Sequence, residues 1–211
     1  LVYTNTNEVM YREEPLRELG AGEAKIRIEA VGICGSDMHA YHGEDTRRVP
    51  PLILGHEAAG VIVSGKQAGQ QVVLNPLIAC GTCEDCRGGR SNLCTNRKLI
   101  GMNYPGAFAE FITIPEQNLI PMPAGMKPTH AALTEPAATS LHAVHLAERA
   151  LHRPVSEGRA LVIHRFAGRA NLALSRLSGN PALRHQSPAP RNRFPHRQLR
   201  RLRSRTGTRR S

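Results

Sequence analysis

Apolar and polar residues alternate over short stretches in the first 125 residues of the chain, which is the pattern of half-buried β-strands. The clearest example is EAKIRIEAVG at 23–32, where every second residue from the alanine onward is apolar. Three further stretches, each bounded by glycine or proline, carry strand patterns at 52–63, 70–76 and 106–115. Short strands separated in this way are typical of a small antiparallel barrel or sandwich. We therefore expect a mainly β domain over residues 1–125.

The pattern changes after this domain. EPAATSLHAVHLAERALH at 135–152 is rich in alanine and places its larger apolar residues near helical spacing, which predicts a helix. GRALVI at 158–163 then has the pattern of a strand, and a strand in this place is how a nucleotide-binding βαβ domain begins. We therefore expect residues 126–163 to form a linker helix and the first strand of a truncated α/β (Rossmann) domain.

The formal net charge of +11 is not spread along the chain. Residues 1–157 contain 14 Lys and Arg against 17 Asp and Glu, a net charge of −3, whereas residues 158–211 contain 14 arginines and no other charged residue. The end of the chain is also rich in proline and serine and has no core-forming periodicity. We therefore expect residues 164–211 to be a disordered basic tail.

Four of the five cysteines lie within fifteen positions, at Cys80, Cys83, Cys86 and Cys94. The spacing C-x2-C-x2-C-x7-C lets the thiolates turn toward one centre, and four sulfurs suit tetrahedral zinc. An iron–sulfur cluster is the nearest alternative, but the last gap differs from the ferredoxin pattern and no proline follows the last cysteine. Disulfides are disfavoured because no secretion signal opens the sequence. Residues 80–94, called the cysteine lobe below, are thus predicted to hold a closed structural zinc site.

Cys34 lies far upstream of this lobe and follows the predicted strand 23–32. His56 and Glu57 belong to another extended stretch, so a barrel could bring the three residues together. Cysteine, histidine and a carboxylate are ligands of catalytic zinc, which keeps one coordination position open. Each residue also has a simpler interpretation, because buried cysteines and hydrogen-bonded histidines are common in protein cores. Spacing alone leaves both interpretations open.

GICGSDMH, LILGHEAAG, the cysteine lobe and GAFAEF follow one another in the order found in the zinc-dependent medium-chain alcohol and polyol dehydrogenases. Residues 1–163 resemble that family, and its sorbitol and threonine dehydrogenase branch most. The resemblance implies a GroES-like catalytic domain and the oxidation of a secondary alcohol to a ketone with NAD or NADP. The substrate would be a polyol, a sugar alcohol or a hydroxy amino acid, and intact members are expected to be homo-oligomers.

The resemblance further implies the ligands of a catalytic zinc. Cys34 and His56 match two ligands, and Glu57 matches a carboxylate that either binds the zinc or approaches it during ligand exchange. Glu135 falls where the polyol branch places a glutamate that binds the zinc directly or through water. Together with the cysteine lobe, the expectation is two zinc ions per chain, one catalytic and one structural.

Catalytic roles follow from the same resemblance. Ser36 matches the hydroxyl that hydrogen-bonds the substrate oxygen, and His39 matches the outer end of the proton relay. Asp37 matches an acid that orients the zinc-binding histidine, a role that metal sites require in general. The chemistry is consistent, because zinc favours loss of the alcohol proton near neutral pH and a histidine with an ordinary pKa of about 6.5 can pass that proton to solvent.

The cofactor-binding half of the family is missing from the sequence. Its first strand runs into G-x-G-x-x-G, which seats the pyrophosphate, but here ALVI is followed by HRFAGRANLAL. We therefore assign no cofactor-binding residues and expect no dehydrogenase activity from this chain by itself. A shift of reading frame after Ile163 would explain the arginine-rich ending. The alternative is a non-enzymatic zinc-binding protein whose basic tail binds nucleic acid.

No apolar run approaches the roughly 20 residues that span a bilayer, and no charged segment followed by an apolar one opens the chain. We therefore expect a cytoplasmic protein that acts on a small-molecule alcohol and does not contact membranes. The tail is expected to attract nucleic acid only non-specifically, through its charge.

Overall fold

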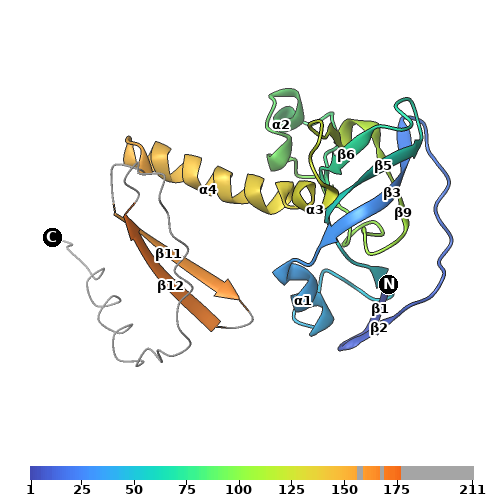
Figure 1. Ribbon diagram of the computed structural model, residues 1–211, viewed down its shortest axis with the longest axis horizontal. Helices are drawn as coiled ribbons and strands as arrows, with labels where there is room; N and C mark the ends of the chain where they lie inside the picture. Colours follow the sequence, from blue (N-terminus) through green and yellow to red (C-terminus); the bar gives the residue numbers. More distant parts are fainter. Residues whose placement is uncertain (156–158, 167–168, 177–211) are drawn as a thin grey trace. The chain divides into compact units, whose positions relative to one another are not determined.

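The computed structural model describes residues 1–155, 159–166 and 169–176 (Figure 1). Its strands are β1 Val2–Asn5, β2 Glu8–Met10, β3 Glu23–Gly32, β4 Leu52–Ile53, β5 Glu57–Ser64, β6 Gln71–Leu74, β7 Leu77–Ile78, β8 Lys98–Leu99, β9 Phe111–Pro115, β10 Leu119–Pro121, β11 Arg159–Phe166 and β12 Arg169–Arg176. Its helices are α1 Gly35–Tyr41, α2 Glu84–Arg87, α3 Pro128–Ala131 and α4 Thr134–Leu151, and two short 3₁₀ helices are η1 Ser91–Leu93 and η2 Glu116–Asn118.

The main sheet has the strand order β10-β6-β5-β3-β9, and its neighbouring strands are antiparallel. Its buried face carries branched aliphatic side chains, which suit a pleated surface. The cluster includes Ile26, Ile62, Leu74, Ile112 and Ile114, all at most 3% exposed. A smaller antiparallel sheet has the order β2-β1-β4. The predicted mainly β domain is confirmed.

The pairing of β3 with β5 brings the residues of the candidate site close together. In β3 the alternation predicted from the sequence holds at Ala24 and Ile26, which are fully buried, and ends at a register shift between Ile28 and Ala30. Gly32, the last residue of β3, pairs with Glu57, the first residue of β5. Because the two strands are antiparallel, the segment that leaves β3 meets the segment that enters β5.

The predicted strand over 52–63 is interrupted, which the sequence analysis did not foresee. β4 ends at Ile53 and β5 begins at Glu57, and Gly55 between them has φ +91°. The backbone of 106–108 crosses this break: Gly106 N–H donates to Ile53 O at 2.7 Å and Ala107 N–H to Gly55 O at 2.9 Å. A Cβ on Gly106 would lie 2.4 Å from the Leu54 carbonyl oxygen, so only glycine permits this crossing. For the same reason β9 begins at Phe111 rather than at 106.

The predicted helix 135–152 is confirmed as α4 Thr134–Leu151, and the predicted strand 158–163 lies in β11. β11 pairs with β12 in an antiparallel hairpin, so residues 164–166 and 169–176 form strands where we expected a disordered tail. RANLALSR alternates apolar and polar residues, a strand pattern that we had attributed to the tail. Residues 177–211 lie outside the described residues. No described helix is long and apolar enough to cross a membrane.

Asn118 anchors the entrance to the cysteine lobe. Its side chain is 3% exposed and its Nδ2 donates to the carbonyl oxygens of Asn75 and Leu77, each at 2.8 Å. The backbone N–H of Asn75 donates in return to Asn118 O at 2.8 Å. These bonds fix the chain where it leaves β6 for the lobe.

Asn118→Ala should lower the free energy of unfolding by about 1 to 3 kcal/mol, because two partly buried carbonyls lose their donor. Urea unfolding under reducing conditions measures the change. Asn92→Ala in the exposed η1 segment is the matched control and should unfold like the parent chain. An unchanged midpoint for Asn118→Ala would show that these bonds do not hold the lobe entrance.

Candidate active site

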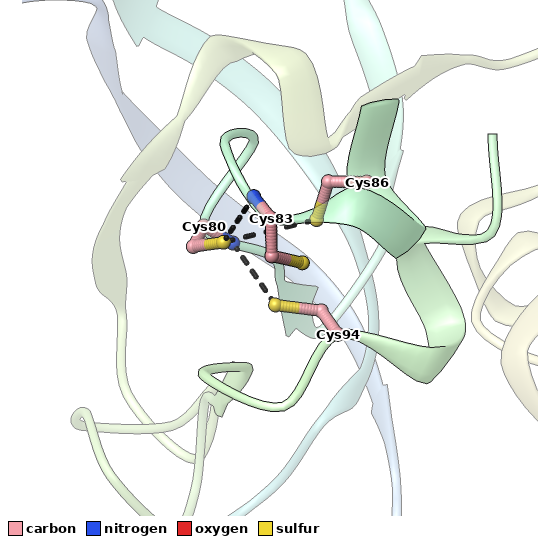
Figure 2. A group of neighbouring side chains, drawn as sticks. All are labelled: Cys80, Cys83, Cys86 and Cys94. Carbon is pink, nitrogen blue, oxygen red and sulfur yellow. Dashed lines mark hydrogen bonds between the residues drawn. The ribbon is translucent and has the colours of Figure 1, made fainter. Parts of the chain in front are cut away.

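The four cysteines of the lobe converge as the spacing predicts. Their sulfurs all lie within 4.8 Å of one another, and Figure 2 shows the four side chains turned toward a common centre. Cys83 N–H donates to Cys80 Sγ and Cys80 N–H donates to Cys94 Sγ, each at 3.4 Å. Gly81, with φ +75°, lets the chain turn between the first two cysteines. None of the five cysteines forms a disulfide.

The electrostatics of the lobe favour a bound cation. The N–H groups of Thr82 and Cys83 lower the pKa of Cys80 to about 6, whereas desolvation and the neighbouring thiols raise the pKa of Cys86 to about 12. The Cys80 and Cys86 sulfurs are 3.9 Å apart, so a second thiolate beside the first is unfavourable. A divalent ion of soft character removes this conflict, since it lets all four sulfurs be thiolates.

Cys34, His56 and Glu57 form the second convergent group. One ligand atom from each lies within 4.8 Å of the others, and His56 and Glu57 are buried. Cys34 directly precedes α1, and the other two residues enter β5. Gly32 leaves room for the carboxylate of Glu57, because a Cβ at that glycine would lie 2.3 Å from Glu57 Oε2.

Asp37, in the first turn of α1, holds this group in place. It is 2% exposed, and its Oδ2 accepts the N–H of Cys34 at 3.0 Å while its Oδ1 accepts the N–H of Gly55 at 3.2 Å. His56 Nδ1 lies 3.5 Å from Asp37 Oδ1 and makes no hydrogen bond. Charge attraction acts at this distance without hydrogen-bond geometry. Since Nδ1 faces the carboxylate, Nε2 is the nitrogen left to face a metal.

The charges of the group are coupled. Burial disfavours a charged His56, but Asp37 and Cys34 outweigh this effect and raise the pKa of His56 to about 10. The His56 ring in turn lowers the pKa of Cys34, and it helps to lower the pKa of Asp37 against the opposing effect of burial. Asp37 and Cys34 thus favour a proton on His56, and a metal cation could replace that proton.

Ser36 and His39 lie on α1, and Ser36 contacts the thiol of Cys34. Both line a cavity of about 400 Å³ whose other walls come from the loop 44–47. His39 Nδ1 lies 2.6 Å from Glu44 Oε2, and both side chains are largely exposed. Ser36 is therefore placed at the inner side of a solvent-open cavity and His39 at its exposed rim.

Glu135 is not part of the metal-ligand group. It lies in the first turn of α4, where its Oε1 accepts the hydroxyl of Thr139 at 3.3 Å. A carboxylate in this place is favourable for the helix, because it faces the positive end of the helix dipole. Of the two candidate glutamates, the structure brings only Glu57 to Cys34 and His56.

The sequence analysis missed Asp45 and Arg48, which lie behind Ser36. Arg48 is 4% exposed and forms an ion pair with Asp45. Its Nη2 donates to Ser36 Oγ at 3.3 Å. Nothing in EDTRRVPP distinguishes a buried arginine from the exposed one beside it, so this contact was not predictable from the sequence.

The family model that describes the alcohol dehydrogenase GroES-like domain matches residues 20–124. L-galactonate-5-dehydrogenase of Escherichia coli (strain K12) is 39% identical over 153 residues, which cover 70% of this chain and 45% of that enzyme. The chain belongs to the zinc-dependent medium-chain alcohol dehydrogenase family. L-threonine 3-dehydrogenase of Bacillus subtilis (strain 168) is 35% identical and covers 63% of the chain and 41% of the enzyme. The chain thus spans less than half the length of these relatives.

Solved structures agree with this assignment. Galactitol-1-phosphate dehydrogenase from Escherichia coli has a TM-score of 0.65 and 30% identity, covering 70% of this chain and 44% of that one. A zinc-binding dehydrogenase from Sinorhizobium meliloti, bound to NADP, has a TM-score of 0.62 and 36% identity, covering 69% and 44%. The family resemblance inferred from the sequence is confirmed, and with it the GroES-like fold.

Asp37→Asn should lower the pKa of His56 from about 10 toward its ordinary value of about 6.5, because the variant lacks the negative charge beside the ring. NMR titration of the metal-free chain measures this pKa. By linkage, the raised value stabilises the fold below about pH 6.5, and this contribution is lost as pH rises through about 10. The variant should lose this contribution.

Glu84→Gln, on the exposed surface of the cysteine lobe, is the control and should leave the pKa of His56 unchanged. An unshifted His56 in Asp37→Asn would show that the carboxylate does not set the charge of the ring.

Proposed function

We propose that this chain forms the zinc-bearing catalytic half of an NAD(P)-dependent dehydrogenase that oxidises a secondary alcohol to a ketone. The alcohol would be a polyol, a sugar alcohol or a hydroxy amino acid, in keeping with relatives named for galactonate and threonine. The observation that carries the proposal is the convergence of Cys34, His56 and Glu57 beside the hydroxyl-bearing Ser36. A zinc-binding protein without catalysis would not need a serine and a histidine at this place. The free thiols also suit the cytoplasm, which we propose as its location.

The donor atoms fit two zinc ions of different kinds. Four thiolates fill the coordination of a tetrahedral ion, so the cysteine lobe would hold a structural zinc with no open position. Cys34, His56 and Glu57 supply at most three ligands in the second group, which leaves a position for substrate. The buried Nδ1 of His56, which faces Asp37, supports the orientation that a zinc-binding histidine needs.

Bound zinc would supply the positive charge that favours loss of the alcohol proton near neutral pH. Ser36 would accept a hydrogen bond from the substrate hydroxyl and, as it takes up that proton, would release its own hydroxyl hydrogen into the cavity that it lines together with His39. His39, on the exposed rim of the same cavity, would deliver the proton to solvent. Glu44 would orient the His39 ring through its contact with Nδ1.

The residues of this chain do not fit NAD(P). The sequence has no G-x-G-x-x-G, and among the described residues β11 pairs with the antiparallel strand β12 rather than with a parallel strand. We therefore assign no step to the cofactor here. The hydride acceptor would bind to the part of the relatives that this chain does not span.

The chain purified under reducing conditions should contain two zinc ions, measured by elemental analysis. Cys83→Ser should remove one of them and unfold the cysteine lobe, because structural zinc binding is worth about 10 to 16 kcal/mol in zinc-finger peptides. Cys34→Ser should remove the other and leave the lobe folded. Ser91→Ala, also in the lobe, should keep both ions. Iron with visible absorbance, or two disulfides, would contradict the assignment.

Activity should appear when residues 1–163 are joined to the cofactor-binding half of the Escherichia coli L-galactonate-5-dehydrogenase. The chimera should reduce NAD or NADP with a polyol or hydroxy acid, and Cys34→Ser should abolish turnover. His39→Ala should slow turnover mainly at low pH, because the proton then depends most on the relay. Stopped-flow absorbance at the nicotinamide band measures the rates.

His42→Ala is the matched control for the relay, since His42 contacts Asn7 on the other side of α1 and does not line the cavity. Its rates should equal those of the unsubstituted chimera at every pH. Full activity of the Cys34→Ser chimera would refute the zinc assignment.

A further inference from the structure

Arg48 is a buried charged side chain that no step of the proposed mechanism uses. Its guanidinium makes three contacts: Nε donates to Gly101 O at 3.0 Å, Nη1 pairs with Asp45, and Nη2 donates to Ser36 Oγ at 3.3 Å. Its side chain is 3% exposed and that of Asp45 9%. Ser36 lines the cavity of about 400 Å³ described above, whereas Arg48 does not. Arg48 therefore contacts the hydroxyl of a cavity-lining residue without lining the cavity itself.

Stability does not by itself explain an arginine in this place. A guanidinium loses its hydration on burial, and the attraction of a carboxylate often only offsets that loss. The neighbouring Arg47 bonds the same carboxylate, through Nε at 2.8 Å and Nη2 at 3.0 Å, while its side chain stays 70% exposed. Asp45 would thus keep a partner without Arg48. What Arg48 provides and Arg47 does not are the bonds to Gly101 O and to Ser36 Oγ, and of these only the second reaches a side chain that lines the cavity.

We propose that Arg48 is a positioning residue that fixes the orientation of the Ser36 hydroxyl toward the substrate, an inference that rests on the proposed function. A serine hydroxyl has one hydrogen and two lone pairs and rotates freely unless a partner holds it. The Arg48 N–H occupies one lone pair from behind and so keeps the hydrogen of Ser36 pointing away from the guanidinium. The Cys34 thiol, which Ser36 also contacts, can take the hydroxyl hydrogen, so the second lone pair is left to accept the substrate hydroxyl.

The geometry also ties this orientation to the rest of the site. Gly101 O, which accepts from Arg48, belongs to the loop that packs on Gly55, since a Cβ at Gly101 would lie 3.0 Å from Gly55 O. Gly55 itself donates to Asp37. Arg48 therefore links Ser36, through Gly101, to the backbone of Gly55, the residue before His56. The positions of Ser36 and His56 thus depend on the same backbone segment.

The test uses the full chain with zinc in the cysteine lobe and Co²⁺ in the Cys34 group, so that it needs neither cofactor nor turnover. Two ligands are titrated while the visible absorption of Co²⁺ is followed: trifluoroethanol, whose hydroxyl needs Ser36, and imidazole, which has no hydroxyl. Arg48→Met should weaken trifluoroethanol binding by about fivefold, the loss expected for one oriented hydrogen bond, and leave imidazole binding unchanged. Arg27→Met, which loses only a surface pair with Glu29, should bind both ligands like the parent.

A double-mutant cycle shows whether Arg48 acts through Ser36. Ser36→Ala should weaken trifluoroethanol binding at least as much as Arg48→Met, and the double variant should bind no more weakly than Ser36→Ala alone. Arg48→Lys keeps the charge but cannot make the three contacts together, so it should restore affinity only in part. If Arg48→Met does not fold, Arg48→Lys decides the question by the same titrations.

Equal trifluoroethanol affinity of the parent and the Arg48 variants would overturn the positioning role and leave the proposed function standing. Additive losses of trifluoroethanol affinity in the double variant would also overturn the positioning role. An equal loss of imidazole binding would overturn it too, because it would show general damage to the metal site. If the parent chain takes up no Co²⁺ in the Cys34 group, or binds no alcohol there, the proposed function fails and the role of Arg48 fails with it.

Discussion

The candidate active site depends on one buried carboxylate. Asp37 accepts the backbone N–H groups of Cys34 and Gly55, which belong to segments that leave β3 and enter β5. A carboxylate that is 2% exposed is stable only if its charge is compensated. Two backbone N–H donors compensate part of the Asp37 charge. The positive charge of the protonated His56 ring compensates the rest. The same group that joins the two segments therefore also demands a positive charge between them, from a proton or from a metal.

The two metal groups of the chain relate to the fold in opposite ways. Within the cysteine lobe only Cys94 is buried, so few apolar contacts are available to hold its short helices in place. A metal bound by the four cysteines would supply the stability that apolar packing does not, as in small metal-bound domains. His56, in contrast, is next to a sheet whose buried face is filled with aliphatic side chains. The packing of this sheet holds His56 in place, which would suit the proposed centre with an open ligand position.

The sequence predicted those features that depend on spacing alone. Four cysteines at short intervals converge in the structure, and the alternation of β3 and the helical spacing of α4 each produced the expected element. The break between β4 and β5 was not predictable in this way, because it depends on the crossing of 106–108, a segment some fifty residues further on. The contact between Arg48 and Ser36 was missed for a similar reason. Burial of an arginine depends on its partners in space, and the sequence around it is that of an exposed loop.

The choice between two glutamates shows how local structure decides a ligand set. Family resemblance offered both Glu57 and Glu135, and neither spacing nor composition separates them. Glu57 is fixed by the pairing of β5 with β3, and its carboxylate lies over Gly32, the residue two before Cys34, so its place is set by the same strands that set the cysteine. Glu135 is fixed instead by α4, where Thr139 and the helix terminus already occupy its carboxylate. Glu57 lies with Cys34 and His56 in the structure and Glu135 does not, which is why Glu57 is the third ligand of the proposed zinc site.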